Sequence, residues 1–242
     1  MTTNNGDQSS KVLLITGASK GIGLAAAKRF AAAGFKIVNI SRSPCDLSGA
    51  TNLSIDLCDR DWGDRYKAQI LNAVGRPEQL VLLHNAAMMT KETVQTIAAD
   101  TLRQVLELNV VAAAQLNTIV LPRMKQGSSV IYISSTLGTK AVANTHAYSV
   151  SKHAVIGQMR ATCQDLAGSM IHTAAICPGF TETEMLSEHL GANPEIYQQI
   201  TAGIAHKRLA QPSEIAETIW FASQNPVING AVIDANLGQI ES

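Results

Sequence analysis

The feature that most constrains the fold is a glycine-rich turn near the N-terminus, Thr16-Gly-Ala-Ser-Lys-Gly-Ile-Gly23. An apolar run at 11–15 precedes it, an alanine-rich stretch at 24–33 follows, and a second apolar run occupies 36–40. This order predicts strand, turn, helix and strand, which is the βαβ unit that binds dinucleotides. The glycines would let backbone N–H groups at the helix N-terminus approach a pyrophosphate. A purely structural turn is the alternative, because the spacing is not the GxGxxG of many dehydrogenases.

The residues after the second predicted strand indicate which dinucleotide is bound. An acidic residue there would accept hydrogen bonds from the ribose of NAD. The sequence has no Asp or Glu between Gly23 and Cys45; Ser41 and Arg42 stand at this place, and Lys20 lies within the turn. Because a guanidinium can hold a phosphate through two hydrogen bonds, these residues favour NADP(H) over NAD(H). A solvated loop arginine is the alternative.

The rest of the chain alternates between strands and helices. Strands are predicted over 52–56, 79–83, 129–133 and 171–176, and helices over 60–73, 100–124 and from Tyr148 to about 167. The alternation predicts an α/β fold, a single-domain doubly wound parallel sheet of the Rossmann type with helices on both faces. We expect one domain over 11–242 after a flexible tail, 1–10. Ligands bind beyond the carboxyl ends of such strands, where Asp56, Asn85, Ser135 and Pro178 stand.

Tyr148 and Lys152 form the most chemically suggestive pair in the sequence. They are four residues apart and would lie on one face of a helix. An ammonium group favours phenolate over phenol, so we expect Lys152 to lower the pKa of Tyr148 towards neutrality. Such a tyrosine could transfer a proton at working pH. The spacing alone also fits a surface lysine beside a half-buried tyrosine.

Composition excludes several classes of function. Of the 242 residues 46% are apolar and 16% charged, and 19 basic residues balance 19 acidic ones, which is typical of a folded protein with no electrostatic attraction to nucleic acid or anionic membranes. No uninterrupted apolar run approaches the ~18–20 residues that span a bilayer. The four cysteines lack metal-ligand spacing, so no metal site is expected, and reduced thiols in a cytoplasmic protein are the simplest interpretation.

Taken in order, these motifs resemble the short-chain dehydrogenase/reductase family, and its 3-oxoacyl carrier-protein reductase-like members in particular. The resemblance covers 11–238, and a stretch at 207–216 resembles the family segment before the last long helix. The elements that carry it are the glycine turn, Asp56, Asn85-Ala86, Asn109, Ser135, Tyr148-x-x-x-Lys152 and Pro178-Gly179.

The resemblance implies a role for each catalytic residue. Tyr148 would be the general acid in carbonyl reduction and the general base in alcohol oxidation. Ser135 would hydrogen-bond the substrate oxygen. Lys152 would hold the nicotinamide ribose, and Asn109 would keep a water that links Lys152 to solvent.

The resemblance also implies a cofactor site. The glycine turn would cradle the pyrophosphate, Asp56 would contact adenine, Asn85-Ala86 would lie along the adenosine ribose, and 178–183 would border the nicotinamide. The expected cofactor-binding residues, besides Tyr148 and Lys152, are Gly17, Ser19, Lys20, Gly21, Ile22, Gly23, Ser41, Arg42, Asp56, Leu57, Asn85, Ala86, Pro178, Gly179, Thr181 and Thr183.

Three departures from the family pattern stand out. The usual Asn-Asn-Ala-Gly is His84-Asn-Ala-Ala87 here, and we expect His84 to change little if that position acts through its backbone, whereas Ala87 would narrow the site. Asn236-Leu-Gly238 stands where Asp-Gly-Gly is common. The short segment between Arg42 and Asp56 predicts a loop in place of a helix.

The segment 180–205, here called the substrate flap, is expected to cover the substrate with Met185, Leu186, His189, Leu190, Ile196, Tyr197 and Ile200. Contact of His189 or His206 with the substrate is an alternative, but a surface position is the favoured expectation for both. No cluster of Arg or Lys precedes Lys207, which favours a neutral ketone, aldehyde or secondary alcohol, or an acyl group carried by a larger partner. The resemblance implies a homo-oligomer, a tetramer or dimer, assembled through the Asn109 and Tyr148 helices.

The sequence therefore predicts an NADP(H)-dependent oxidoreductase that transfers a hydride between nicotinamide and a carbonyl or secondary alcohol; a 3-oxoacyl reductase is one form of it. An NAD-dependent secondary alcohol dehydrogenase is the first alternative. A non-catalytic dinucleotide-binding redox sensor is an alternative of another class.

Overall fold

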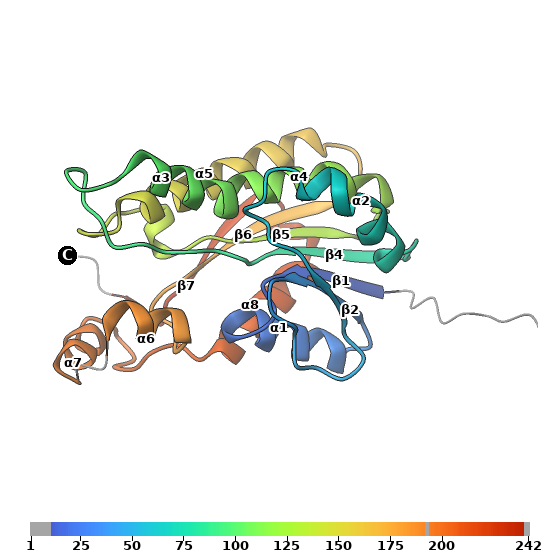
Figure 1. Cartoon of the computed structure of the whole chain (residues 1–242). Helices are drawn as coiled ribbons and strands as arrows, with labels where there is room; N and C mark the ends of the chain where they lie inside the picture. The colour runs from blue at the N-terminus through green and yellow to red at the C-terminus, as the bar shows by residue number, and fades with distance from the viewer. Residues whose placement is uncertain (1–10, 192–193, 240–242) are drawn as a thin grey trace, which may run out of the picture.

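Seven parallel strands form a single sheet in the order β3-β2-β1-β4-β5-β6-β7 (Figure 1). The computed structural model describes residues 11–191 and 194–239, so the predicted tail at 1–10 lies outside the described residues. The strands are β1 (Lys11–Thr16), β2 (Lys36–Ser41), β3 (Thr51–Ser54), β4 (Gln79–His84), β5 (Ser129–Ile133), β6 (His172–Pro178) and β7 (Ala231–Ala235). Every neighbouring pair is parallel, which confirms the predicted doubly wound sheet.

Helices cover both faces of this sheet. They are α1 (Gly21–Ala32), α2 (Trp62–Val74), α3 (Ala99–Leu106), α4 (Ala112–Val120), α5 (His146–Asp165), α6 (Glu184–Leu190), α7 (Pro194–Ala202) and α8 (Pro212–Gln224). Figure 1 shows α2, α4 and α5 along one face and α1 with α8 along the other. The helices α6 and α7 lie in the substrate flap.

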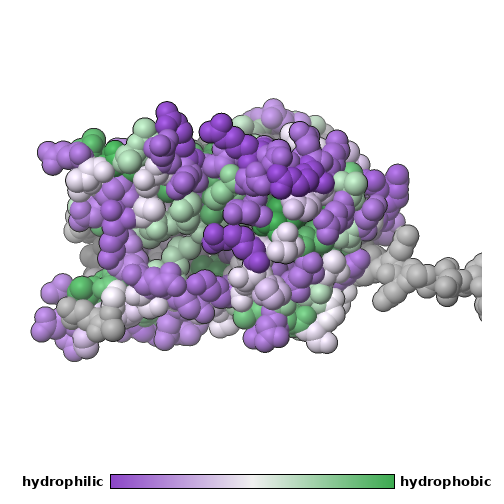
Figure 2. All heavy atoms as spheres, in the orientation of Figure 1, coloured by the Kyte–Doolittle hydropathy of each residue, from purple (hydrophilic) through white to green (hydrophobic). Residues whose placement is uncertain are grey.

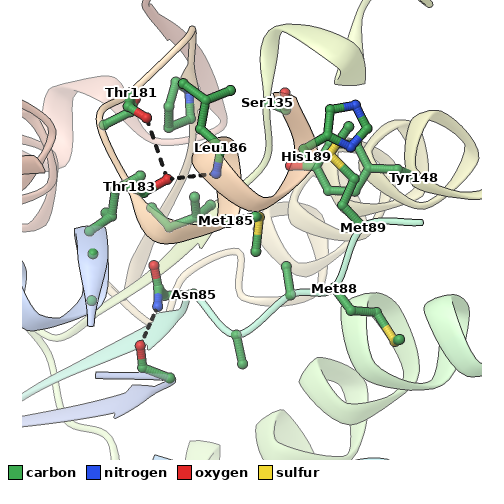
Figure 3. Close-up of a pocket in the computed structure, with 18 of the residues that line it drawn as sticks. Asn85, Met88, Met89, Ser135, Tyr148, Thr181, Thr183, Met185, Leu186 and His189 are labelled. Carbon is green, nitrogen blue, oxygen red and sulfur yellow. Dashed lines mark hydrogen bonds between the residues drawn. The ribbon is translucent and has the colours of Figure 1, made fainter. Parts of the chain in front are cut away.

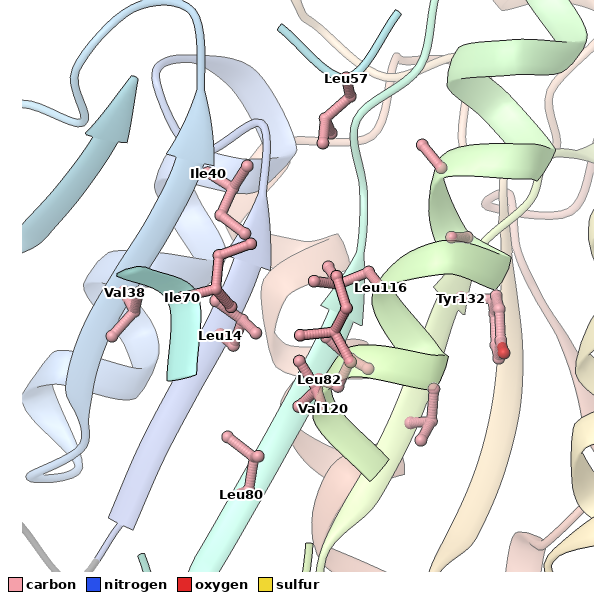
Figure 4. Packing of buried hydrophobic residues seen from close by; sticks show 14 of the residues in the cluster. Leu14, Val38, Ile40, Leu57, Ile70, Leu80, Leu82, Leu116, Val120 and Tyr132 are labelled. Carbon is pink, nitrogen blue, oxygen red and sulfur yellow. The ribbon is translucent and has the colours of Figure 1, made fainter. Parts of the chain in front are cut away.

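The strands alternate their side chains between two apolar cores. Val12 and Leu14 of β1 belong to the core under α2, α4 and α5, and Figure 4 shows Leu14, Leu82 and Leu116 within this core. The other core, under α1 and α8, receives alternate residues of the same strands, such as Leu13. Because both faces are covered, the strands read as continuous apolar runs in the sequence.

The predicted helix over 100–124 is interrupted. A π-helical turn, Glu107–Val111, joins α3 to α4, and a short 3₁₀ turn, Leu121–Arg123, ends the segment. The π-helical turn carries the buried Asn109. Among the described residues, one helical segment, Ala99–Arg123, is long and apolar enough to cross a membrane. The core helix of a folded domain can have the same length and composition, so this is weak evidence for a membrane span.

Three other boundaries differ from the sequence expectation. The helix after the glycine turn begins at Gly21, so two glycines lie in its first turn. The third strand ends at Ser54, two residues before Asp56. The seventh strand was not predicted, although its apolar run follows Gly230 and pairs with β6. The segment between β2 and β3 forms no helix, which confirms the predicted loop.

Candidate active site

A cavity of about 740 Å³, here called the main cavity, opens at the carboxyl ends of the strands. Figure 2 shows a recess between the upper helices and the α6–α7 segment, with hydrophobic residues at its base. Every residue expected to bind cofactor lines the main cavity, and so do Ser135, Tyr148 and Lys152. The structure thus brings together residues from six separate strand ends.

The glycine turn is packed so closely that side chains would not fit. A Cβ on Gly23 would lie 2.1 Å from the carbonyl oxygen of Gly17. Gly17 has φ +74, and a Cβ there would lie 3.0 Å from the Cα of Ala86. Gly21 also has positive φ, at +55. These positions need glycine, and they let the N-terminus of α1 face the cavity.

Asn85 ties the end of β4 to this turn. Its side-chain amide donates to the carbonyl oxygens of Thr16, at 3.0 Å, and Gly17, at 2.9 Å. The Thr16 hydroxyl in turn accepts from the backbone N–H groups of Asn85 and Ala86, both at 3.0 Å. In this structure the Asn85 amide therefore holds the turn, while Ala86 and Ala87 line the cavity.

The end of β2 presents hydroxyl and cationic groups to the cavity. Ser41 and Arg42 both line it, and the Arg42 side chain is exposed. Lys20 lies nearby in the turn, where its Nζ is 3.4 Å from Glu188 of α6. Both partners of that pair are more than half exposed, so it contributes little to stability. Asp56 lines the cavity from the next strand, and its Oδ1 accepts from the N–H of Cys58.

Tyr148 and Lys152 lie in the first two turns of α5 and are both buried. The Lys152 Nζ donates to the carbonyl oxygen of Ile133 at 2.8 Å and lies 5.4 Å from the centre of the Tyr148 ring. Burial lowers the pKa of Lys152 to about 8. It also raises the pKa of Tyr148 to about 12, which the neighbouring Ser135 hydroxyl offsets in part.

The expected lowering of the Tyr148 pKa is therefore wrong for this structure. Loss of hydration is the largest cause of the raised Tyr148 pKa, and the Lys152 ammonium is held by a backbone carbonyl. The phenol is protonated at neutral pH.

Ser135 follows β5 and begins a short 3₁₀ turn, Thr136–Gly138, by accepting from the N–H of Leu137 at 3.1 Å. Its neighbour Ser134 donates to the carbonyl oxygen of Lys152 at 2.9 Å. Ser134 therefore anchors the end of β5 to the helix that carries Tyr148, and Ser135 lines the cavity beside it.

Asn109 does not line the main cavity. Its Oδ1 accepts from the N–H of Met88, and its Nδ2 donates to the Met88 carbonyl oxygen and to Ser151. The Ser151 hydroxyl donates to the carbonyl oxygen of Tyr148 at 2.7 Å. Asn109 thus connects the loop after β4 to α5, and its contacts do not reach Lys152.

The flap supplies much of the apolar wall. Of its expected apolar residues, Met185, Leu186, Leu190 and Ile200 line the main cavity, whereas Ile196 and Tyr197 do not. Thr183 caps α6 by accepting from the N–H of Leu186 and donates to the carbonyl oxygen of Thr181, as Figure 3 shows. Gly179, before the flap, packs so closely on Asn236 that a Cβ there would lie 2.7 Å from the Asn236 Cβ.

Histidine 189 differs from the expectation of a surface residue. It is half-buried and lines the main cavity, and in Figure 3 it projects from α6 into the region that Tyr148 and Met89 also face. His206 is exposed, as expected. Sequence periodicity could not separate the two, because the position of α6 over the cavity decides the outcome.

His84 is buried, and its side chain takes part in a chain of hydrogen bonds, so this position does not act through its backbone alone. Its Nε2 lies 2.8 Å from Oδ1 of Asn117, whose Nδ2 donates to the Tyr132 hydroxyl at 2.7 Å. The Tyr132 hydroxyl lies 2.9 Å from that of Thr162 in α5. Burial lowers the pKa of His84 to about 4, so the imidazole is neutral. This chain links the end of β4 to α4, β5 and α5.

Several lining residues gave no signal in the sequence. Met88 and Met89 follow Asn85-Ala86 without a recognisable pattern, and Val142 precedes α5 in an irregular loop. Glu92 was also missed: it is buried and its Oε1 accepts from the N–H of Ala147, in the first turn of α5. Across 11–191 and 194–239 the structure holds no group of three or more His, Cys, Asp or Glu that could bind a metal.

Comparisons with known proteins agree with this geometry. The protein FixR of Bradyrhizobium diazoefficiens is 30% identical over 95% of this chain and 86% of its own length. The 3-oxoacyl-[acyl-carrier-protein] reductase MabA of Mycobacterium tuberculosis is 29% identical over 95% of this chain and 92% of its own. The crystal structure of a putative NAD(P)-dependent gluconate 5-dehydrogenase from Beutenbergia cavernae is 27% identical, with a TM-score of 0.85 over 96% of this chain and 98% of that one.

The family model for short chain dehydrogenases matches residues 11–193, which include the glycine turn, Ser135, Tyr148 and Lys152. The chain therefore belongs to the short-chain dehydrogenase/reductase family.

Proposed function

We propose that this protein is an NADP(H)-dependent oxidoreductase that reduces a ketone or aldehyde, or oxidises the corresponding secondary or primary alcohol. The observation that carries the proposal is the convergence of Ser135, Tyr148 and Lys152 on the cavity that the glycine turn also lines. A buried phenol beside a buried ammonium is costly to hold and has no packing advantage over apolar residues. Such a pair in a cleft is typical of a reaction centre.

The residues of the turn fit a dinucleotide. Glycine at 17, 21 and 23 leaves a backbone surface without side chains at the N-terminus of α1, where N–H groups and the helix dipole favour a pyrophosphate. When bound, the nicotinamide cofactor supplies the hydride for reduction of the carbonyl carbon and accepts it in the reverse direction.

The preference for NADP(H) rests on the end of β2. Ser41 and Arg42 stand there, no carboxylate lies between Gly23 and Cys45, and Lys20 is close in the turn. Arg42 and Lys20 would hold the phosphate of the adenosine ribose. The Beutenbergia cavernae relative, which is described as NAD(P)-dependent and whose structure holds NADP at low occupancy, supports the same choice by similarity. Asp56 and Leu57 would border the adenine.

The protein's own residues would supply the proton and position the substrate and the cofactor. Tyr148, protonated at neutral pH, would donate its phenolic proton to the carbonyl oxygen as that oxygen gains charge. Ser135 would hydrogen-bond the same oxygen and orient it. Lys152 would hold the nicotinamide ribose. Asn109 would act as a positioning residue through Met88 and Ser151.

The substrate would be largely apolar. The flap and the loop after β4 surround the substrate end with thioether and aliphatic side chains, among them Met88, Met185 and Leu186. A 3-oxoacyl thioester is one member of this class, and the similarity to MabA supports it.

We also propose that 11–242 is one domain that acts in the cytoplasm as a homodimer or homotetramer. Val111 at the end of the π-helical turn and Val150 of α5 are 38% and 43% exposed, which supports assembly through these helices. Light scattering would report a mass of two or four chains; a monomer at micromolar concentration would contradict this assembly.

The first experiment is a titration of the purified protein with NADPH and NADH, followed by nicotinamide fluorescence. We expect NADPH to bind at least roughly tenfold more tightly, about 1.4 kcal/mol. Equal or weaker binding of NADPH would contradict the assignment of cofactor and favour an NAD-dependent alcohol dehydrogenase. Oxidation of bound NADPH by a panel of ketones and aldehydes would then test the reaction itself.

A further inference from the structure

The substrate end of the main cavity is built from apolar side chains with a single imidazole among them. Its walls include Met88, Met89, Val142, Met185, Leu186 and Leu190. Among the described residues that line the main cavity, the cationic side chains are Lys20 and Arg42 of the cofactor end and Lys152, whose Nζ is held by Ile133. Thr181, Thr183 and Glu184 of the flap also line the main cavity, but His189 is the polar flap side chain that Figure 3 shows beside Tyr148.

His189 stands where two cavities meet. Together with Ala143 and Leu190 it lines both the main cavity and a neighbouring pocket of about 500 Å³, here called the outer pocket. The outer pocket is more polar, since Lys91, Glu92, Thr93, Thr96 and Asn144 also line it. A substrate whose carbonyl lies at Tyr148 and whose chain follows the apolar wall would pass His189 before it reached solvent. Figure 3 shows the His189 ring on that side of Tyr148.

The groups that face His189 favour its neutral form. Burial and the positive charge of Lys91 lower the pKa of His189, and the negative charge of Glu92 opposes them only in part. One oxygen of Glu92 is committed, because its Oε1 accepts from the N–H of Ala147 at 2.7 Å. A neutral imidazole can donate one hydrogen bond and accept another.

We propose that His189 is the specificity-determining residue of the substrate site, where it hydrogen-bonds an uncharged polar group, such as a hydroxyl, ester or amide, on an otherwise apolar carbonyl substrate. This inference rests on the proposed function. It narrows the substrate class from any apolar ketone to one that carries a second, uncharged hydrogen-bonding group beyond the reacting carbonyl.

A free carboxylate is the less suitable second group. It would meet a neutral imidazole and lie near the negative charge of Glu92. It would also lose its hydration against the apolar wall of the main cavity, which is costly, and the nearest cation, Lys91, lies beyond that wall in the outer pocket. An ester or hydroxyl loses less hydration and gains a hydrogen bond to His189.

The test compares three matched families of substrate with the complete enzyme and NADPH. The families are unsubstituted alkyl ketones, keto esters of the same length with the ester moved stepwise along the chain, and the corresponding keto acids. The variants are His189→Leu, which keeps bulk and removes hydrogen bonding, and His189→Gln, which keeps a hydrogen-bonding group. His206→Leu is the matched control, since His206 is exposed and lines neither cavity.

We expect the wild type to prefer the best keto ester to the alkyl ketone by roughly tenfold in kcat/KM, and to disfavour the keto acid. His189→Leu should remove that preference by raising the KM of the ester roughly tenfold more than the KM of the alkyl ketone. His189→Gln should keep most of the preference for the keto ester, and His206→Leu should keep all of that preference. Equal effects of His189→Leu on ester and ketone, or no effect on either, would overturn the inference.

A binding measurement separates this inference from the proposed function. Calorimetry with NADP⁺ present compares the hydroxy ester with the alkyl alcohol for wild type and His189→Leu. If His189→Leu binds the hydroxy ester roughly tenfold more weakly than the wild type does, the role of His189 is supported even if turnover is absent. If the wild type and His189→Leu bind the hydroxy ester with equal affinity, the role of His189 is overturned. The proposed function is tested separately, by ketone reduction, and does not depend on that result.

Discussion

The two ends of the main cavity are built in different ways. At the cofactor end the surface is backbone: Gly17 and Gly23 of the turn lie against the end of β4, and the Asn85 side chain ties the two together with hydrogen bonds of 3.0 and 2.9 Å. At the substrate end the surface is side chain, and methionines such as Met89 and Met185 form much of it.

This difference indicates how the molecule divides its functions. A backbone surface that is fixed by strand ends cannot change its shape. Such a surface suits a cofactor that is the same molecule in every turnover. Thioether side chains are flexible and polarizable, so a methionine-rich wall accepts substrates of varied shape. We therefore expect substitutions at the cofactor end to affect all substrates equally, and substitutions at the substrate end to affect them selectively.

The largest expected effect comes from Tyr148→Phe, at the boundary between the two ends. The variant lacks the proton donor, so turnover should fall roughly 10³-fold, while NADPH binding stays near that of the wild type. NADPH oxidation and fluorescence titration measure the two quantities. Tyr66→Phe in α2, outside the main cavity, is the matched control. Retained turnover in Tyr148→Phe would contradict the assigned acid.

A second prediction concerns His84, the last residue of β4, which directly precedes Asn85 at the cofactor end. Its pKa is about 4 in the folded protein against 6.5 when hydrated. As the pH falls from about 6.5 towards 4, His84 becomes protonated in the unfolded chain but stays neutral in the folded protein. Protonation therefore favours the unfolded state, and the free energy of unfolding decreases by up to about 3 kcal/mol once the pH is below both pKa values.

Denaturant unfolding between neutral pH and pH 4 would measure this loss. His172, whose pKa burial also lowers, adds to the same slope, so His84→Gln is needed to isolate the contribution of His84. The variant should show a flatter pH dependence. A slope equal to that of the wild type would show that His84 is not the group responsible.

A third prediction breaks the backbone surface directly. In Gly23→Ala the new methyl would lie 2.1 Å from the Gly17 carbonyl oxygen, so the turn must shift. We expect a loss of about 1–3 kcal/mol in stability and weaker binding of both NADPH and NADH, with all substrates affected alike. Gly63→Ala in α2 is the control, because its methyl would meet nothing closer than 3.8 Å. Tight cofactor binding by Gly23→Ala would contradict the close-packed turn.

The smallest expected effect is on cofactor choice. Arg42→Gln should lower the preference for NADPH over NADH by roughly tenfold, about 1.4 kcal/mol, with NADH binding unchanged. Paired fluorescence titrations measure this ratio. An unchanged ratio would remove Arg42 from the phosphate site and leave Lys20 as the remaining cation.

Much of the cofactor end could be predicted from the sequence because it depends on local backbone geometry. Glycine spacing between a strand and a helix, and residues at strand ends, are visible in the chain itself. The substrate end could not be predicted to the same depth. Whether His189 or His206 faces the cavity depends on where α6 packs, and nothing in the local pattern encodes that position.

The electrostatic expectations failed for a related reason. Proximity of Tyr148 and Lys152 is readable from a four-residue spacing, but burial is a property of the whole fold, and it determines the direction of the Tyr148 pKa. Likewise, the chain from His84 to Thr162 joins residues far apart in sequence. The π-helical turn that places Asn109 has no recognised sequence signal in this segment.

The most direct measurement of the central claim is transfer of deuterium from NADPH labelled at the reactive carbon of nicotinamide. The wild type is incubated with the labelled cofactor and the best keto ester, and the product is analysed by mass spectrometry and NMR. We predict one deuterium at the carbinol carbon, in a single stereochemical configuration, and none with Tyr148→Phe over the same time. Binding of NADPH without deuterium in any product from the carbonyl panel would contradict the account and indicate a protein that binds the cofactor but does not use it for reduction.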